Sequence, residues 1–204
     1  MRLDVPVVLA TGNAGKVREF DRLFAGGLHV VRMPAEATLP DETGIKFAQN
    51  ARLKAQKVFD DLGGAQAVLA DDSGLEVTAL GGRPGIYSAR FAGENATDAD
   101  NVARLLRELD GAPDRTAQFV CALCLIVPGP GGVASEVLEV EACSRGAITL
   151  GPRGSDGFGY DPVFQPDGWC QTLAEASPDA KDAVSHRGAA ARLLLERLGR
   201  PGGE

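Results

Sequence analysis

The amino-acid sequence predicts an α/β protein built around a mixed β-sheet, and two observations support this fold class. In the first half of the chain, short apolar runs alternate with segments whose apolar residues recur every three or four positions, as on one face of a helix. In the second half, two long segments of strand character flank a Pro-Gly turn, a pattern typical of a β-hairpin. Helices that alternate with strands early, followed by a late hairpin, indicate a mixed sheet with helices around it.

The predicted elements of the first half follow from local signals. We expect a strand at 5–10, a helix from 14, a strand at 29–33, a helix from 44 and a strand at 67–70. Each of these helices is predicted to end at a Gly-Gly pair, which favours helix termination. The sequence Asp71-Asp72-Ser73-Gly74 then predicts a turn, and 75–80 a second short strand or a bend.

In the second half, Thr97 and Asp100 resemble a capping box, which predicts a helix start. Val102 and Leu105 belong to the apolar face of that helix. Two strands are expected at 118–127 and 133–144, and a last helix at 188–198. With 204 residues and no internal repeat or clear linker, the sequence predicts one domain over 1–204, which has room for two lobes.

Composition and charge exclude several classes of partner. The net charge is −7 and no run of Lys and Arg stands out, so an extended nucleic acid is not expected to bind, whereas a single nucleotide with its own metal is compatible. No stretch reaches membrane-spanning length, and the apolar N-terminal run is too short for a signal peptide. We therefore expect a cytoplasmic protein whose cysteines are reduced thiols.

A Cys-x-x-Cys sequence, Cys121 and Cys124, invites a zinc or redox interpretation. The surrounding apolar segment 119–127 favours a buried strand instead, in which residues three apart point to opposite faces. Cys143 and Cys170 lie far apart in the sequence and supply no second close pair. The strand interpretation is therefore preferred.

Two polar turns follow apolar runs and suggest a site for phosphates and a metal. Residues 11–16 read Thr-Gly-Asn-Ala-Gly-Lys, and a strand-to-helix turn of this kind lets backbone amides approach an anion while Lys16 reaches it. The turn is not a P-loop, and a plain glycine-rich connection with an exposed lysine stays an open alternative. Asp71 and Asp72 form the second turn and are the type of ligand that Mg²⁺ prefers. Glu42 is a third candidate, although an acid that complements a helix dipole explains it locally.

Two further segments are candidate ligand contacts. The glycine-rich segment 157–162 carries Phe158 and Tyr160, whose rings either stack on a base or pack into the core. Ser185-His186-Arg187 precedes the last predicted helix. His186 and Arg187 are potential donors to a ligand, and the alternative is a Ser185 N-cap with two solvated neighbours. No Ser-His-Asp nucleophilic triad is persuasive, and the G-x-S-x-G motif is absent.

Four separated motifs together resemble the inosine/xanthosine triphosphate pyrophosphatase family, which removes non-standard purine nucleotides. The motifs are Ala-Thr-Gly-Asn-Ala-Gly-Lys at 10–16, the segment 71–90 from Asp-Asp-Ser-Gly to Gly-Ile-Tyr-Ser-Ala-Arg, Gly-Phe-Gly-Tyr-Asp-Pro-Val-Phe at 157–164, and Ser-His-Arg-Gly at 185–188. Phe47, Asn50 and Lys54-Ala55 also fit the family's helix pattern. Gln49 departs from it, because many members carry Glu there.

The resemblance implies an elongated ITPase-like α/β fold, with flanking helices and two lobes around a central cleft, that forms a homodimer. It implies Mg²⁺-dependent hydrolysis of ITP, dITP and XTP to the monophosphate and pyrophosphate. Asp72 would be the proton acceptor and, with Glu42, a metal ligand. Residues implied to contact the nucleotide are Thr11, Gly12, Asn13, Ala14, Gly15, Lys16, Ser73, Phe158, Gly159, Tyr160, Asp161, Lys181, His186 and Arg187.

This chemistry agrees with the residue types. Lys16, backbone amides and Mg²⁺ stabilise the charge of departing pyrophosphate when water attacks the α-phosphorus. Donors such as His186 and Arg187 near C6 of the base favour the oxygen of hypoxanthine or xanthine over the amino group of adenine. Two alternatives remain at this point: a pyrophosphatase for other nucleoside triphosphates, and a nucleotide-binding regulatory protein without turnover.

Overall fold

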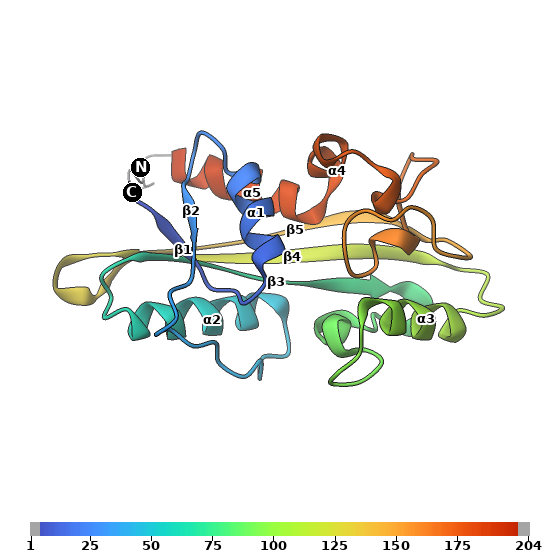
Figure 1. The fold of residues 1–204 in the computed structure, drawn as a ribbon, viewed down its shortest axis with the longest axis horizontal. Helices are drawn as coiled ribbons and strands as arrows, with labels where there is room; N and C mark the ends of the chain where they lie inside the picture. Colours follow the sequence, from blue (N-terminus) through green and yellow to red (C-terminus); the bar gives the residue numbers. More distant parts are fainter. Residues whose placement is uncertain (1–4, 200–204) are drawn as a thin grey trace. The chain divides into compact units, whose positions relative to one another are not determined.

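The computed structural model describes residues 5–199, so the first four and last five residues of the predicted single domain lie outside the described part. The fold class is confirmed: a six-stranded mixed sheet in the order β2-β1-β3-β4-β5-β6 is flanked by helices (Figure 1). The strands are β1 (Val7–Leu9), β2 (Val30–Arg32), β3 (Ala67–Val77), β4 (Thr116–Pro128), β5 (Ala134–Ile148) and β6 (Phe164–Pro166). The α-helices are α1 (Ala14–Leu23), α2 (Phe47–Asp61), α3 (Asp98–Glu108), α4 (Pro178–Val184) and α5 (His186–Gly199).

The chain divides into two compact units, and β3, β4 and β5 each contribute residues to both. Unit 1 comprises Met1–Asp72, Cys121–Ala142 and Arg187–Glu204. Unit 2 comprises Ser73–Val120 and Cys143–His186. Each unit has its own apolar core. The predicted elongated shape and central cleft stay predictions.

In unit 1, three parallel strands carry helices on both faces. β1 pairs with β2 on one side, Val7 opposite Val30, and with β3 on the other, Val7 opposite Ala67. α1 and α5 lie on one face of these strands and α2 lies on the opposite face (Figure 1). The core on the α1 side contains Phe20 and Phe24, which stack with ring centroids 5.9 Å apart. The predicted helix from 14 is thus confirmed as α1, which buries Phe20 against this core.

In unit 2, the apolar core joins α3, parts of the long strands and the segment around β6. Leu105 and Leu109 are fully buried in it together with Phe164. The predicted capping box is confirmed, because the Thr97 hydroxyl accepts a hydrogen bond from the Asp100 amide while the Asp100 carboxylate accepts one from the Thr97 amide. The predicted hairpin is confirmed as β4 and β5, with the Gly129 amide donating to the Val133 carbonyl at 2.8 Å.

The predicted turn at Asp71–Gly74 is wrong. β3 continues through it to Val77, so the expected second short strand is the end of the same strand, followed by a 3-10 turn at Thr78–Leu80. Buried carboxylates in a strand are unfavourable unless cations compensate them, and these cations come from distant segments.

α4 and β6 were not predicted. Within the described residues, no helix has both the length and the apolar character needed to span a membrane.

Candidate active site

The order in which strands are added to the sheet reverses at β1, because β2 lies on one side of it and β3 on the other. This reversal places the candidate site. After β1 the chain passes through α1 to β2, and after β2 it passes through α2 to β3 on the other side of β1. Because α1 and α2 lie on opposite faces (Figure 1), a crevice is expected at the carboxyl ends of β1 and β3. β1 ends at Leu9, opposite Leu69, so Asp71 and Asp72 lie beyond its end. The turn 11–16 begins at the same edge.

The turn 11–16 is a capped helix start. Asn13 is the N-cap of α1, and its Oδ1 accepts hydrogen bonds from the amides of Gly15 at 2.8 Å and Lys16 at 3.3 Å. The Asn13 amide itself donates to the Thr11 hydroxyl at 3.1 Å. The amides of Asn13, Gly15 and Lys16 are therefore already bonded within the turn. A phosphate at this edge would meet the Lys16 ammonium group, and it could use the amides of Gly15 and Lys16 only by displacing the side-chain oxygen Oδ1 of Asn13.

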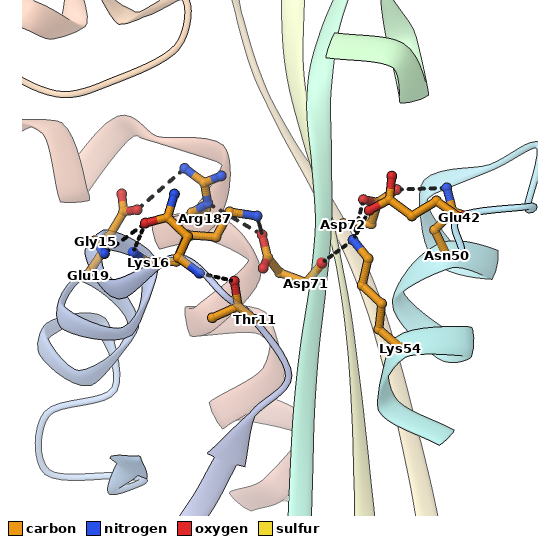
Figure 2. Close-up of polar contacts among 11 residues, drawn as sticks. Thr11, Gly15, Lys16, Glu19, Glu42, Asn50, Lys54, Asp71, Asp72 and Arg187 are labelled. Carbon is orange, nitrogen blue, oxygen red and sulfur yellow. Dashed lines mark hydrogen bonds and ion pairs between the residues drawn. The ribbon is translucent and has the colours of Figure 1, made fainter. Parts of the chain in front are cut away.

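Asp71 lies on the face of β3 that carries α1 and α5 (Figure 2). Its Oδ2 is 2.8 Å from Lys16 Nζ and 3.7 Å from Arg187 Nε, and Arg187 Nη1 is 3.4 Å from Glu19 Oε2. Burial alone would raise the pKa of Asp71, but Lys16, Arg187 and Lys54 outweigh it and hold the pKa well below its usual range. Asp71 is thus an anion at neutral pH that holds two cations at the end of β1.

Asp72 lies on the opposite side of β3, facing α2 (Figure 2), as expected for adjacent residues in an extended chain. Its Oδ1 is 2.8 Å from Lys54 Nζ, and its Oδ2 accepts a hydrogen bond from Asn50 Nδ2 at 3.1 Å. Lys54 Nζ is also 2.6 Å from Glu42 Oε1. The two predicted metal ligands, Glu42 and Asp72, therefore contact one ammonium group.

Burial and charge set the protonation of this pair. Burial raises the pKa of Asp72, with a further contribution from Glu42, and these effects exceed the opposing effect of Lys54. Burial disfavours the charged form of Lys54, but Asp72, Asp71 and the hydrogen bond to Glu42 raise its pKa above the ordinary value. Asp72 therefore has the raised pKa expected of a carboxylate that accepts a proton, and Lys54 is a stable cation beside it.

Asn50 ties the segment before α2 to Asp72. Its Oδ1 accepts a hydrogen bond from the Gly44 amide at 2.8 Å, which leaves its Nδ2 to donate to Asp72. A Cβ at Gly44 would lie 2.6 Å from Asn50 Oδ1, so glycine is needed for this close approach. Gln49 accepts from the Ile45 amide at 2.9 Å, a role that requires only an acceptor. Gln49 therefore satisfies the Ile45 amide as a Glu at this position would.

The donor set at Glu42 and Asp72 fits a divalent cation that is bound together with a ligand. Two carboxylates from different segments lie within hydrogen-bond distance of a single cationic group. Among residues 5–199, no group of three or more His, Cys, Asp and Glu side chains is arranged to hold a metal. Mg²⁺ is commonly held by one or two carboxylates with phosphate oxygens and waters completing the shell. The pair fits that pattern and not an all-protein metal cage.

In unit 2, the structure brings together Phe158, Asp161 and Lys181. Lys181 Nζ is 2.7 Å from Asp161 Oδ2 and 5.0 Å from the centroid of the Phe158 ring. Asp161 also accepts a hydrogen bond from the Phe158 amide at 2.9 Å. Tyr160 is buried and donates its hydroxyl to the Ser88 carbonyl, so for Tyr160 the core interpretation is correct. Phe158 is partly exposed, and its role in binding a base stays a prediction.

His186 and Arg187 are both buried, so the alternative of two solvated neighbours is wrong. The His186 ring stacks on Phe119 in unit 2, with centroids 4.6 Å apart and an interplanar angle of 13°. Arg187 belongs to unit 1, where it pairs with Glu19 and Asp71. Ser185, between α4 and α5, is fully buried, and Ser73 lies within β3.

Sequence reasoning did not assign roles to Lys54, Asn50 and Glu19. A signal for the first two was present, because the buried stripe of α2 at three- and four-residue spacing includes Asn50 and Lys54 among apolar residues. A polar side chain on a buried stripe needs a partner. The partners lie in β3 and the segment before α2, which no local pattern indicates. Glu19 is likewise a buried acid on α1.

The Cys-x-x-Cys pair has no shared environment. Cys121 lies near Asp71, Arg187 and Lys16, whereas Cys124 lies near Glu139 and Arg52. Burial raises the pKa of both thiols, that of Cys124 to about 12. The two side chains are buried among different groups, as predicted for opposite faces of a strand, and thiols with raised pKa values are poor metal ligands.

A mixed α/β fold with cations and carboxylates at the carboxyl ends of parallel strands defines a class of protein suited to charged ligands. Comparison with known proteins is more specific. A model of the Ham1 family matches residues 7–197, and the chain belongs to this family.

Among its relatives are the dITP/XTP pyrophosphatase of Geobacillus kaustophilus, 51% identical over 94% of this chain and 93% of the relative, and that of Exiguobacterium sp., 47% identical over 92% and 94%. The structure of the Staphylococcus aureus Ham1 protein matches with a TM-score of 0.82 and 39% identity, covering 95% of this chain and 98% of that one.

Proposed function

We propose that this protein hydrolyses non-canonical purine nucleoside triphosphates, namely ITP, dITP and XTP, to the monophosphate and pyrophosphate. The observation that carries the proposal is the group of charged side chains past the end of β1, where Lys16 and the Glu42–Asp72 pair lie on the two sides of β3 (Figure 2). The names of relatives at 51% and 47% identity supply the substrate class. The predicted nucleotide-binding turn and carboxylates thus occur at one strand edge.

The charge balance of unit 1 supports a metal-dependent reaction. The groups that meet at this edge are the cations Lys16, Lys54 and Arg187 and the carboxylates Glu19, Glu42, Asp71 and Asp72. Carboxylates therefore outnumber cations, and a triphosphate brings further negative charge. A divalent cation held by Glu42 and Asp72 would offset that charge and polarise the phosphoryl oxygens. We propose Mg²⁺ for this position.

The side chains have separable roles in the proposed reaction. Lys16 binds phosphate oxygens, and Asp71 keeps the Lys16 ammonium at the end of β1. Asp72 orients the attacking water and accepts its proton. The water attacks the α-phosphorus, and the bond to the bridging oxygen breaks, so pyrophosphate leaves. Charge on the leaving group is stabilised by Lys16.

Recognition of the base is proposed to depend on donors that match an oxygen at C6. His186 and Arg187 are predicted donors, and Phe158 with Lys181 supplies a ring and a cation within unit 2. A site built for an oxygen acceptor leaves the amino group of adenine unmatched. We further propose, from the family resemblance, that the protein is a cytoplasmic homodimer.

A substrate panel tests the proposed function. Pyrophosphate release with Mg²⁺ would be measured from ITP, dITP, XTP, GTP, ATP and dUTP. We expect rapid release from ITP, dITP and XTP and release from ATP that is slower by at least about 100-fold, because the amino group of adenine leaves the donors unmatched. Guanine also carries oxygen at C6, so slower release from GTP would have to come from crowding or unpaired groups near its 2-amino group. Preference for another triphosphate would favour a pyrophosphatase of different base choice. ITP binding without release from any substrate would favour a regulatory protein and contradict the proposal.

A further inference from the structure

We propose that Lys54 is a built-in counter-ion that occupies the cation position between Glu42 and Asp72 until a divalent metal displaces it. This inference rests on the proposed function in taking Glu42 and Asp72 as the metal ligands. Lys54 Nζ is 2.6 Å from Glu42 Oε1 and 2.8 Å from Asp72 Oδ1, and it is also 3.2 Å from the Asp71 carbonyl oxygen (Figure 2). These oxygens surround the ammonium group as ligands surround a small cation.

The position of Lys54 on α2 explains this contact. Lys54 is one turn after Asn50 on the buried stripe of the helix, and its side chain is only 10% exposed. From the buried face of α2, the ammonium group reaches the two carboxylates and the strand carbonyl together. Burying a lysine without such partners is costly. Lys54 therefore remains on the carboxylates unless a stronger cation takes its place.

The ammonium group of Lys54 determines the order in which the metal and the triphosphate bind. Lys54 neutralises one of the two negative charges that attract a metal, so the free protein binds a divalent cation weakly. When a triphosphate is present, its oxygens offer Lys54 an alternative anionic partner within reach of the same edge. Lys54 thus couples metal binding to the presence of the triphosphate and disfavours a metal-loaded enzyme without substrate.

The test measures metal affinity and does not need a nucleotide. Mn²⁺ would be titrated into the full-length protein, and free Mn²⁺ followed by electron paramagnetic resonance. Removal of a positive charge within hydrogen-bond distance of both ligands should tighten binding, so Lys54→Met is expected to lower the Mn²⁺ Kd by at least about tenfold. Lys57→Met is the matched control, because Lys57 lies on the same helix and pairs with Asp61 instead. We expect it to bind Mn²⁺ like the wild type.

A second single variant covers the case in which Lys54→Met does not fold, and a double variant shows where the Mn²⁺ binds. Lys54→Gln removes the charge but retains a donor, and it is measured in place of Lys54→Met if the latter does not fold. The double variant Lys54→Met/Asp72→Asn should lose the gain in affinity, which localises the Mn²⁺ at this pair. Unchanged or weaker Mn²⁺ binding by the folded Lys54 variant would overturn the inference. Failure of the wild type to release pyrophosphate would instead count against the proposed function alone.

Discussion

Asp71 and Asp72 are adjacent in the chain but have opposite environments. Lys16 and Arg187 stabilise the charged form of Asp71, whereas burial and Glu42 disfavour the charged form of Asp72. Strand geometry explains the difference, because successive residues of a strand point to opposite faces of the sheet. Asp71 therefore faces α1 and α5, whereas Asp72 faces α2. One carboxylate is thus suited to holding cations in place and the other to accepting a proton. The sequence identified both residues, but the division of roles follows from their partners.

Replacement of the proposed proton acceptor should abolish turnover and leave the fold intact. Asp72→Asn is expected to lower kcat for ITP by at least about 100-fold, the range typical of a lost general base. Burial already disfavours the charged form of Asp72, so the neutral amide should not unfold the protein. Steady-state kinetics and the urea midpoint check this. Turnover near that of the wild type would rule out the assigned role.

Asp71 should stabilise the fold in a pH-dependent way. Its folded-state pKa lies below the unfolded value, so its contribution is present above about pH 4 and is lost as the pH falls from there toward the folded-state pKa. Asp71→Asn should lower the free energy of unfolding by about 3 kcal/mol at pH 7, as for other broken buried ion pairs. The difference from the wild type should shrink below pH 4.

Urea unfolding at pH 7, 5 and 3.5 measures this dependence. The exposed Asp110 provides a control, and Asp110→Asn should change the free energy of unfolding little at each pH. A loss in Asp71→Asn that stays constant down to pH 3.5 would show that the carboxylate charge is not its cause.

At the scale of elements, the site depends on the contacts that α2 and the segment before it make with β3, through Asn50, Lys54 and Glu42. Local patterns predicted α1, α2 and the capping box of α3, because apolar spacing and cap residues act within a few residues. The same patterns failed at β3, where charge compensation from α1, α2 and α5 lets the strand continue through Asp71 and Asp72. Such compensation is a tertiary effect. The candidate residues were therefore predictable, and their pairing was not.

Asn50 should act as a positioning residue for Glu42 and Asp72. Asn50→Ala removes the link between the Gly44 amide and Asp72, and it should lower kcat/KM by about 10- to 100-fold, as for residues that orient metal ligands. Asn50→Asp keeps an acceptor for Gly44 but places a second carboxylate beside Asp72, so it should preserve the urea midpoint better than it preserves activity.

Gln49→Ala is the matched control for these variants. Gln49 lies beside Asn50, and its side chain accepts a hydrogen bond from the nearby Ile45 amide, so kcat/KM should stay within about twofold of the wild type. Equal losses in the Gln49 and Asn50 variants would indicate general damage to the start of α2 and would contradict a specific positioning role.

For the whole molecule, family membership and topology lead to the same account. The Ham1 model covers residues 7–197, and the structure has two units, with the proposed phosphate and metal groups in unit 1 and the Phe158–Lys181 group in unit 2. The reversal of strand order between β1 and β3 places charged groups at the carboxyl ends of these strands. Hydrolysis at the α-phosphorus is the central claim that this arrangement supports.

The most direct test identifies the bond that is cleaved. ITP would be incubated with the protein and Mg²⁺, and the products followed by ³¹P nuclear magnetic resonance, with the Asp72→Asn variant as the control. The account predicts inosine monophosphate and pyrophosphate in equal amounts from the wild type, and almost no conversion by the variant. Inosine diphosphate with inorganic phosphate as the first products would contradict attack at the α-phosphorus and with it the proposed reaction.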